Sequence, residues 1–194
     1  MTTLYYQVDC TRFNTDRHTK EEPAVIRIAW WRDDAPEPEC VLVKPPADAT
    51  MDDYTKRYHG IDLDTVMDLG ISPSAAVLMF DGALEGVDER VAFVAAFHER
   101  NLNRLARSID DGEDVVTATE CAQKVATPIM NLPRMAPGGG VKPPSLIEAC
   151  EYFHVEKPLS LEQEPDPVKR GKSLVAAVRG VWEAIHAPAP KLAA

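Results

Sequence analysis

The stretch Leu4-Tyr5-Tyr6-Gln7-Val8-Asp9-Cys10-Thr11 (residues 4–11) decides the expected fold. Its first five residues, from Leu4 to Val8, are rich in aromatic and branched side chains, which is typical of a short β-strand. Asp9 follows directly, where the C-terminal end of a first strand would place a functional side chain. We therefore expect a strand over residues 4–8 that ends at a candidate functional carboxylate.

Two further strands are expected soon after the first. Val25 to Trp31 alternates in part between apolar and polar residues, and Glu39 to Val43 is a short apolar run. The turn-forming residues 33–38 separate them, and Pro45-Pro46 ends the last strand. Three strands in quick succession predict an antiparallel meander.

The rest of the chain alternates between helical and apolar patterns. Residues 90–97 predict a strand covered on both faces, with His98 directly after it. Helices are expected over residues 52–67 with an interruption at His59-Gly60, 74–85, 101–109, 120–129 and 168–186, and after Ser145, which forms a capping box with Glu148. Gly138–Gly140 is expected to be a connector, and residues 156–167 a loop. The order predicts an α/β fold with a mixed sheet flanked by helices.

Composition restricts the function classes. The 194 residues include 31 acidic and 21 basic side chains, a formal net charge of −10, which disfavours sequence-independent attraction to nucleic acid. The 4 cysteines form no CxxC pair, so a structural zinc site is not indicated. No run is long enough to span a bilayer, and we expect a soluble cytoplasmic protein with no membrane partner. We expect one domain over residues 1–186 and a disordered tail over residues 187–194.

Five segments, in order and spacing, resemble the DEDDh 3′–5′ exonucleases, the group of the proofreading epsilon subunit of bacterial DNA polymerase III, and especially its phage-type members. The segments are YYQVDCT (5–11), RYHGID (57–62), VAAFHERNLNRL (94–105), NLPRMAPGGGVKPPSLIEACEYF (131–153) and KSLVAAVRGVWEAI (172–185). The resemblance implies a ribonuclease H-like fold, with an antiparallel N-terminal meander and flanking helices, over most of the chain.

The resemblance also implies what the site would need and what this sequence lacks. Such exonucleases hold two divalent metals through four carboxylates, and a histidine acts as general base. Here Asp9 keeps the first carboxylate, and His98 stands on the histidine of the second motif. The other family positions carry Thr11 for a glutamate, Asn103 for an aspartate, Lys172 for a histidine and Ala177 for an aspartate.

One carboxylate cannot hold two hard divalent ions, so no cofactor is expected, and Asp9 is the one metal ligand if there is any. Asp62, Glu164 or Asp166 would be the replacement ligands if the alignment is shifted. Lys172 or Arg179 is a candidate cation to pair with Asp9 in place of a metal. The resemblance also makes His59 and Arg179 candidate binding residues, although His59 could simply order the loop that it begins, and His98 could be a hydrogen-bonded core histidine.

The sequence is consistent with three alternative functions. The first is a catalytically degenerate exonuclease-like module that binds a protein partner, such as a replication or phage protein, or the end of single-stranded DNA or RNA. The second is an active 3′–5′ exonuclease that uses Mg²⁺ or Mn²⁺ with an unusual ligand set. The third is a structural or assembly component that keeps only the fold. The acidic composition favours a protein partner.

Overall fold

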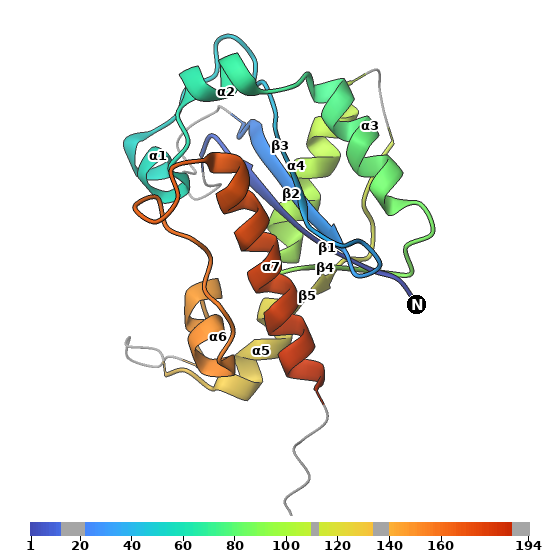
Figure 1. The fold of residues 1–194 in the computed structure, drawn as a ribbon, viewed down its shortest axis with the longest axis vertical. Helices are drawn as coiled ribbons and strands as arrows, with labels where there is room; N and C mark the ends of the chain where they lie inside the picture. The colour runs from blue at the N-terminus through green and yellow to red at the C-terminus, as the bar shows by residue number, and fades with distance from the viewer. Residues whose placement is uncertain (13–21, 110–112, 134–139, 188–194) are drawn as a thin grey trace, which may run out of the picture.

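A five-stranded mixed sheet forms the centre of the molecule (Figure 1). The computed structural model describes residues 1–12, 22–109, 113–133 and 140–187. The strands are β1 (Thr3–Cys10), β2 (Val25–Arg32), β3 (Glu39–Leu42), β4 (Glu89–Ala92) and β5 (Glu120–Cys121), in the sheet order β3-β2-β1-β4-β5. The first three strands pair antiparallel, whereas β4 and β5 continue the sheet in parallel. The expected mixed sheet with an N-terminal meander is therefore confirmed.

Helices pack on both faces of this sheet. They are α1 (Asp53–His59), α2 (Leu63–Leu69), α3 (Pro73–Leu84), α4 (Ala95–Arg107), α5 (Ala122–Met130), α6 (Leu146–Phe153) and α7 (Pro167–His186). Side chains that precede helices cap them: Asp52, Asp62, Ser72, Ser145 and Asp166 each accept a hydrogen bond from a backbone N–H of the first turn. The predicted capping box of Ser145 and Glu148 is present. No helix of the described residues is long and apolar enough to cross a membrane.

The central strand β1 is covered on both faces, so its alternate side chains enter different cores. Leu4, Tyr6 and Val8 belong to a cluster with residues of α3 and α4, whereas Tyr5 belongs to a cluster with α5, α6 and α7. In Figure 1, α7 lies across one face of the sheet and α4 lies behind it. Because side chains of a strand alternate, Asp9 shares the face of Tyr5 and points to the α7 side.

One expected strand is shorter than predicted, and its second half belongs to a turn and a helix. The apolar run at residues 90–97 predicts a strand, but β4 ends at Ala92 and α4 begins at Ala95. The run is apolar because it contains both a buried strand and the first turn of a buried helix, and periodicity does not separate these in so short a segment. His98 therefore lies in α4 and not at a strand end. The tail from residue 188 and Gly138–Gly139 lie outside the described residues.

Candidate functional site at Asp9

Asp9 lies at the end of β1 and forms an ion pair with an arginine of the neighbouring strand. The antiparallel register of β1 and β2 places Arg27 directly opposite Asp9. Its Nε and Nη2 atoms lie 2.6 Å and 2.5 Å from Asp9 Oδ2. The guanidinium therefore occupies one oxygen of the carboxylate with two charge-assisted contacts.

The other oxygen of Asp9 faces a histidine. His59 is the last residue of α1, and its Nδ1 lies 2.9 Å from Asp9 Oδ1. Gly60 follows in the left-handed conformation at φ 63°, which ends the helix and turns the chain away from the site. Both oxygens of Asp9 thus have a nitrogen partner from the protein itself.

Arg27 is held in place by more than Asp9. Its side chain is 2% exposed, and Nη1 donates to the carbonyl oxygen of Pro167 at 2.6 Å. Gly171 of α7 makes room for it, because a Cβ at that position would lie 3.0 Å from Arg27 Cδ and closer still to Cys40 Sγ. The first turns of α7 are therefore shaped around the arginine.

The electrostatic balance at Asp9 favours the charged carboxylate. Burial by itself raises the pKa of Asp9, but the charges and hydrogen bonds of Arg27 and His59 outweigh it, so the pKa lies well below the usual range. The carboxylate is ionised at neutral pH and is already neutralised by the protein. This is the reverse of a metal site, in which the ion supplies the compensating charge.

The two second-motif positions that lie in α4 make structural hydrogen bonds. His98 is 6% exposed, and its Nδ1 lies 3.0 Å from Val8 N and 3.1 Å from Val8 O. Burial lowers the pKa of His98 to about 4, so the ring is neutral. Asn103 donates from Nδ2 to Val116 O at 2.6 Å and accepts from Val116 N at 2.9 Å.

The other family positions do not face Asp9 as ligands. Thr11 Oγ1 accepts from Ala24 N at 3.1 Å, and Ala177 lies on the buried side of α7. Lys172 lies 3.6 Å from Glu37, and so does not supply the cation at Asp9.

Arg179 also contacts other residues. It pairs with Glu183 at 2.7 Å, and its guanidinium carbon lies 4.3 Å from the centroid of the Trp31 ring. A cation next to Asp9 is present, but Arg27 supplies it instead of Lys172 or Arg179.

The replacement carboxylates are used elsewhere. Asp62 caps α2 through Thr65 N, and Asp166 caps α7. Glu164 lies 3.5 Å from Lys169. Within the described residues, no group of three or more His, Cys, Asp or Glu side chains could hold a metal ion. The donors at Asp9 therefore do not fit a pair of divalent cations, since the facing groups are a guanidinium and an imidazole.

Sequence reasoning missed Arg27 and the contact of His59 with Asp9. The one available signal was an arginine in the middle of the apolar run Val25 to Trp31, because a charge in a buried strand needs a partner. The partner depends on strand register, which the sequence alone did not provide.

Two exposed tyrosines lie on α1 next to this centre. Tyr54 and Tyr58 are 63% and 66% exposed, and their rings stack with centroids 6.3 Å apart and an angle of 27° between planes. The Tyr58 ring also meets the His59 ring edge-on at 5.1 Å. Partial desolvation and the charge of Asp9 raise the pKa of Tyr58. The pair therefore forms an aromatic surface beside the Asp9 centre.

Comparison with known proteins identifies the fold. No protein-family model and no curated protein matches the sequence. Among solved structures, E. coli exonuclease I in complex with a dA16 oligonucleotide matches with a TM-score of 0.68 and 13% identity, over 95% of this chain and 41% of that one. The ExoI/SSB-Ct complex matches with a TM-score of 0.68 and 11% identity, over 95% and 41%.

This chain thus spans about two fifths of the length of the exonuclease I chains. A further exonuclease I structure matches over 94% of this chain and 40% of its own chain. At such low identity the similarity establishes architecture and not activity. The chain has the ribonuclease H-like fold of an exonuclease domain.

Proposed function

We propose that this protein is an exonuclease-fold binding module that does not hydrolyse phosphodiesters. The observation that carries this proposal is the ion pair of Asp9 with Arg27, with His59 on the other carboxylate oxygen. Family-type hydrolysis needs metals that activate water and stabilise the leaving oxygen. In place of that metal, a fixed guanidinium neutralises the one carboxylate that this chain retains.

A cation that is part of the protein differs from a metal in what it can do. A guanidinium has no open coordination position and does not lower the pKa of a bound water. A metal that displaced Arg27 from Asp9 would leave the buried guanidinium without its carboxylate, which costs several kcal/mol, on the order of 3–5. Mg²⁺ must in addition give up part of its water shell, for which several oxygens are needed. These costs support a site that stays metal-free.

The first proposed ligand is the end of a single-stranded nucleic acid, on the stacked rings of Tyr54 and Tyr58. Aromatic surfaces hold single strands by stacking on bases, irrespective of sequence. With a net charge of −10, such binding would be weak and strongly dependent on salt. E. coli exonuclease I, a structural neighbour, is known in complex with dT13 and dA16 oligonucleotides.

The second proposed ligand is a protein, such as a replication or phage protein. The acidic surface favours it over a polyanion. Tyrosine is also enriched where protein interfaces are buried. The ExoI/SSB-Ct complex is an example of a protein ligand in a structural neighbour.

Hydrolysis is tested with labelled single-stranded DNA and RNA in Mg²⁺ or Mn²⁺. We expect no degradation above that of an Asp9→Ala variant purified in the same way, and no metal-dependent rise in Tm. Degradation by the wild type that Asp9→Ala abolishes, together with stabilisation by Mn²⁺, would establish the active exonuclease instead.

Binding is tested by fluorescence anisotropy with labelled oligo-dT and oligo-rU at low salt. Tyr58→Ala should weaken binding by about 1–3 kcal/mol, the usual value for one stacked base. Tyr152→Ala is the matched control, because Tyr152 is also exposed but lies on α6. If neither oligonucleotide binds at low salt, the nucleic-acid ligand is ruled out and the protein ligand is the proposal that stands. That ligand is tested by affinity purification, in which the proteins bound by the wild type are compared with those bound by Tyr58→Ala.

A further inference from the structure

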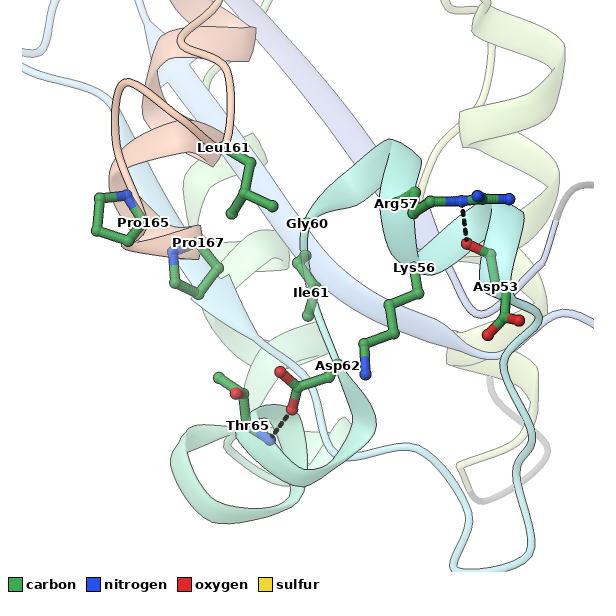
Figure 2. Close-up of a pocket in the computed structure, with 10 residues that line it drawn as sticks. All are labelled: Asp53, Lys56, Arg57, Gly60, Ile61, Asp62, Thr65, Leu161, Pro165 and Pro167. Carbon is green, nitrogen blue, oxygen red and sulfur yellow. Dashed lines mark hydrogen bonds between the residues drawn. The ribbon is translucent and has the colours of Figure 1, made fainter.

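A cavity of about 560 Å³ lies between α1, the beginning of α2 and the segment before α7. Its size is within the range of pockets that hold small molecules. Asp9, Arg27 and His59 do not line it, so it is separate from the centre described above. Figure 2 shows that its lining comes from two sides of different chemistry.

One side of the cavity is apolar. Leu161, Pro165 and Pro167 lie together on one side in Figure 2, next to the Gly60-Ile61 backbone. Leu161 is 51% exposed and lines the cavity. This wall would bury an apolar side chain of a ligand.

The other side carries two cations and two carboxylates. Lys56, Arg57 and Asp53 come from α1, and Asp62 lies at the start of α2. Among the described residues, none of the four takes part in a salt bridge. Asp62 caps α2, with Oδ1 accepting from Thr65 N, and Arg57 donates from Nε to the backbone oxygen of Asp53.

The two walls are fixed to one another by a buried arginine. Arg170, 3% exposed, donates from Nη1 to Glu164 O at 2.6 Å and from Nη2 to Gly60 O at 2.7 Å. A side chain at Gly60 would collide with that guanidinium, since a Cβ there would lie 2.8 Å from Nη2. The cavity is therefore preformed, which lowers the entropic cost of binding.

The balance of charges indicates the class of ligand. A simple anion would meet as many carboxylates as cations, so the lining gives it no net attraction. A zwitterion satisfies both kinds of group, with its carboxylate towards Lys56 or Arg57 and its ammonium towards Asp62 or Asp53. We propose that this cavity binds a free α-amino acid with an apolar side chain, which packs on Leu161 and the two prolines.

The test is isothermal titration calorimetry of the full chain with L-phenylalanine as the probe. L-Phenylalanine should give saturable binding at millimolar concentration or below. N-Acetyl-L-phenylalanine lacks the ammonium and L-phenylalanine amide lacks the carboxylate, and each should bind at least about tenfold more weakly, which corresponds to about 1.4 kcal/mol. Equal binding of either derivative, or no saturable binding of L-phenylalanine, would overturn the proposal.

Variants of cavity residues, each with a matched control, test whether L-phenylalanine binds in this cavity. Asp62→Asn keeps an N-cap side chain but removes the charge, and Asp64→Asn is its control because Asp64 is exposed and does not line the cavity. Lys56→Gln is paired in the same way with Lys124→Gln on α5. Asp62→Asn and Lys56→Gln should each weaken L-phenylalanine binding about tenfold or more, and the controls should not change it.

Two further outcomes would decide against the amino acid. Tighter binding of adenosine monophosphate than of L-phenylalanine would identify an anionic ligand instead. Unchanged L-phenylalanine binding by Leu161→Trp, which should fill the apolar side, would place the ligand elsewhere. The inference does not rest on the proposed function at Asp9, because its result is independent of whether the protein degrades nucleic acid.

Discussion

The two charged regions on either side of the α1–α2 junction differ in how their charges are matched. At Asp9, each carboxylate oxygen has a nitrogen partner within the protein, and Arg27 is nearly inaccessible. In the cavity, Lys56, Arg57, Asp53 and Asp62 stay open to solvent and, among the described residues, join in no salt bridge. The same helix contributes to both. Charges that are already matched stabilise a structure, whereas unmatched charges are free to recognise a ligand.

The largest effect should come from removing one partner of the matched pair. Arg27→Ala leaves Asp9 buried without its guanidinium and should lower the free energy of unfolding by about 3–5 kcal/mol. Arg107→Ala, in an exposed pair with Asp114, should cost only about 0–1 kcal/mol. Urea denaturation at neutral pH measures both. A similar cost for the two would contradict the comparison.

The pH dependence sharpens the same point. Since the pKa of Asp9 in the folded state lies below that of the unfolded chain, its stabilisation is complete above the usual carboxylate range and is lost as the pH falls through the folded-state pKa. The difference between wild type and Arg27→Ala should therefore be constant near neutrality and become smaller in strong acid. A constant difference down to strongly acidic pH would show that Asp9 is not the group that Arg27 stabilises.

The second effect concerns His98. Between its usual pKa of 6.5 and the folded value of about 4, the unfolded chain binds a proton that the folded chain does not. Lowering the pH through this window should thus cost stability, up to about 3 kcal/mol from this group. His98→Gln keeps an acceptor for Val8 N and should remove that part of the slope in denaturation curves. The same slope in the variant would exclude His98 as its source.

The third effect tests whether α7 is fitted to Arg27. Gly171→Ala adds a methyl group against Arg27 and Cys40, and overpacking of this kind costs about 1–3 kcal/mol. Gly82→Ala is the control, because a Cβ there meets nothing within 4 Å, and it should raise the stability of α3 slightly. Thermal denaturation compares the two. A neutral Gly171→Ala would show that Arg27 has room to move.

The smallest effect belongs to the cavity. Lys56→Gln removes a charge that has no salt bridge among the described residues, so the free energy of unfolding should change by less than about 0.5 kcal/mol. Its effect should appear in ligand binding alone. A loss of stability comparable to that of Arg27→Ala would mean that the cavity charges are also structural.

Much of the fold could be predicted from the sequence, and less of the site. The first three strands and the capping box at Ser145 follow from local patterns, which act over a few residues. The strand expected over residues 90–97 was mostly wrong, because apolar residues occur in a buried strand and a buried helix alike.

The site depends on contacts between distant residues. Asp9 and Arg27 meet through strand register, His59 through the end of α1, and Pro167 through the beginning of α7. None of these is encoded in a short motif. The sequence did indicate that Asp9 would need a cation in place of a metal, but it pointed to Lys172 or Arg179, which contact Glu37 and Glu183.

The fit between Gly171 and Arg27 also restricts how this protein can evolve. With a lone acidic substitution near Asp9, the Arg27 guanidinium would still occupy Asp9 Oδ2. A lone loss of Arg27 would leave that oxygen without its cation. Neither step alone produces a group of carboxylates that is free to hold an ion. An ion-binding pocket at Asp9 would therefore require coupled changes on β2 and its surroundings.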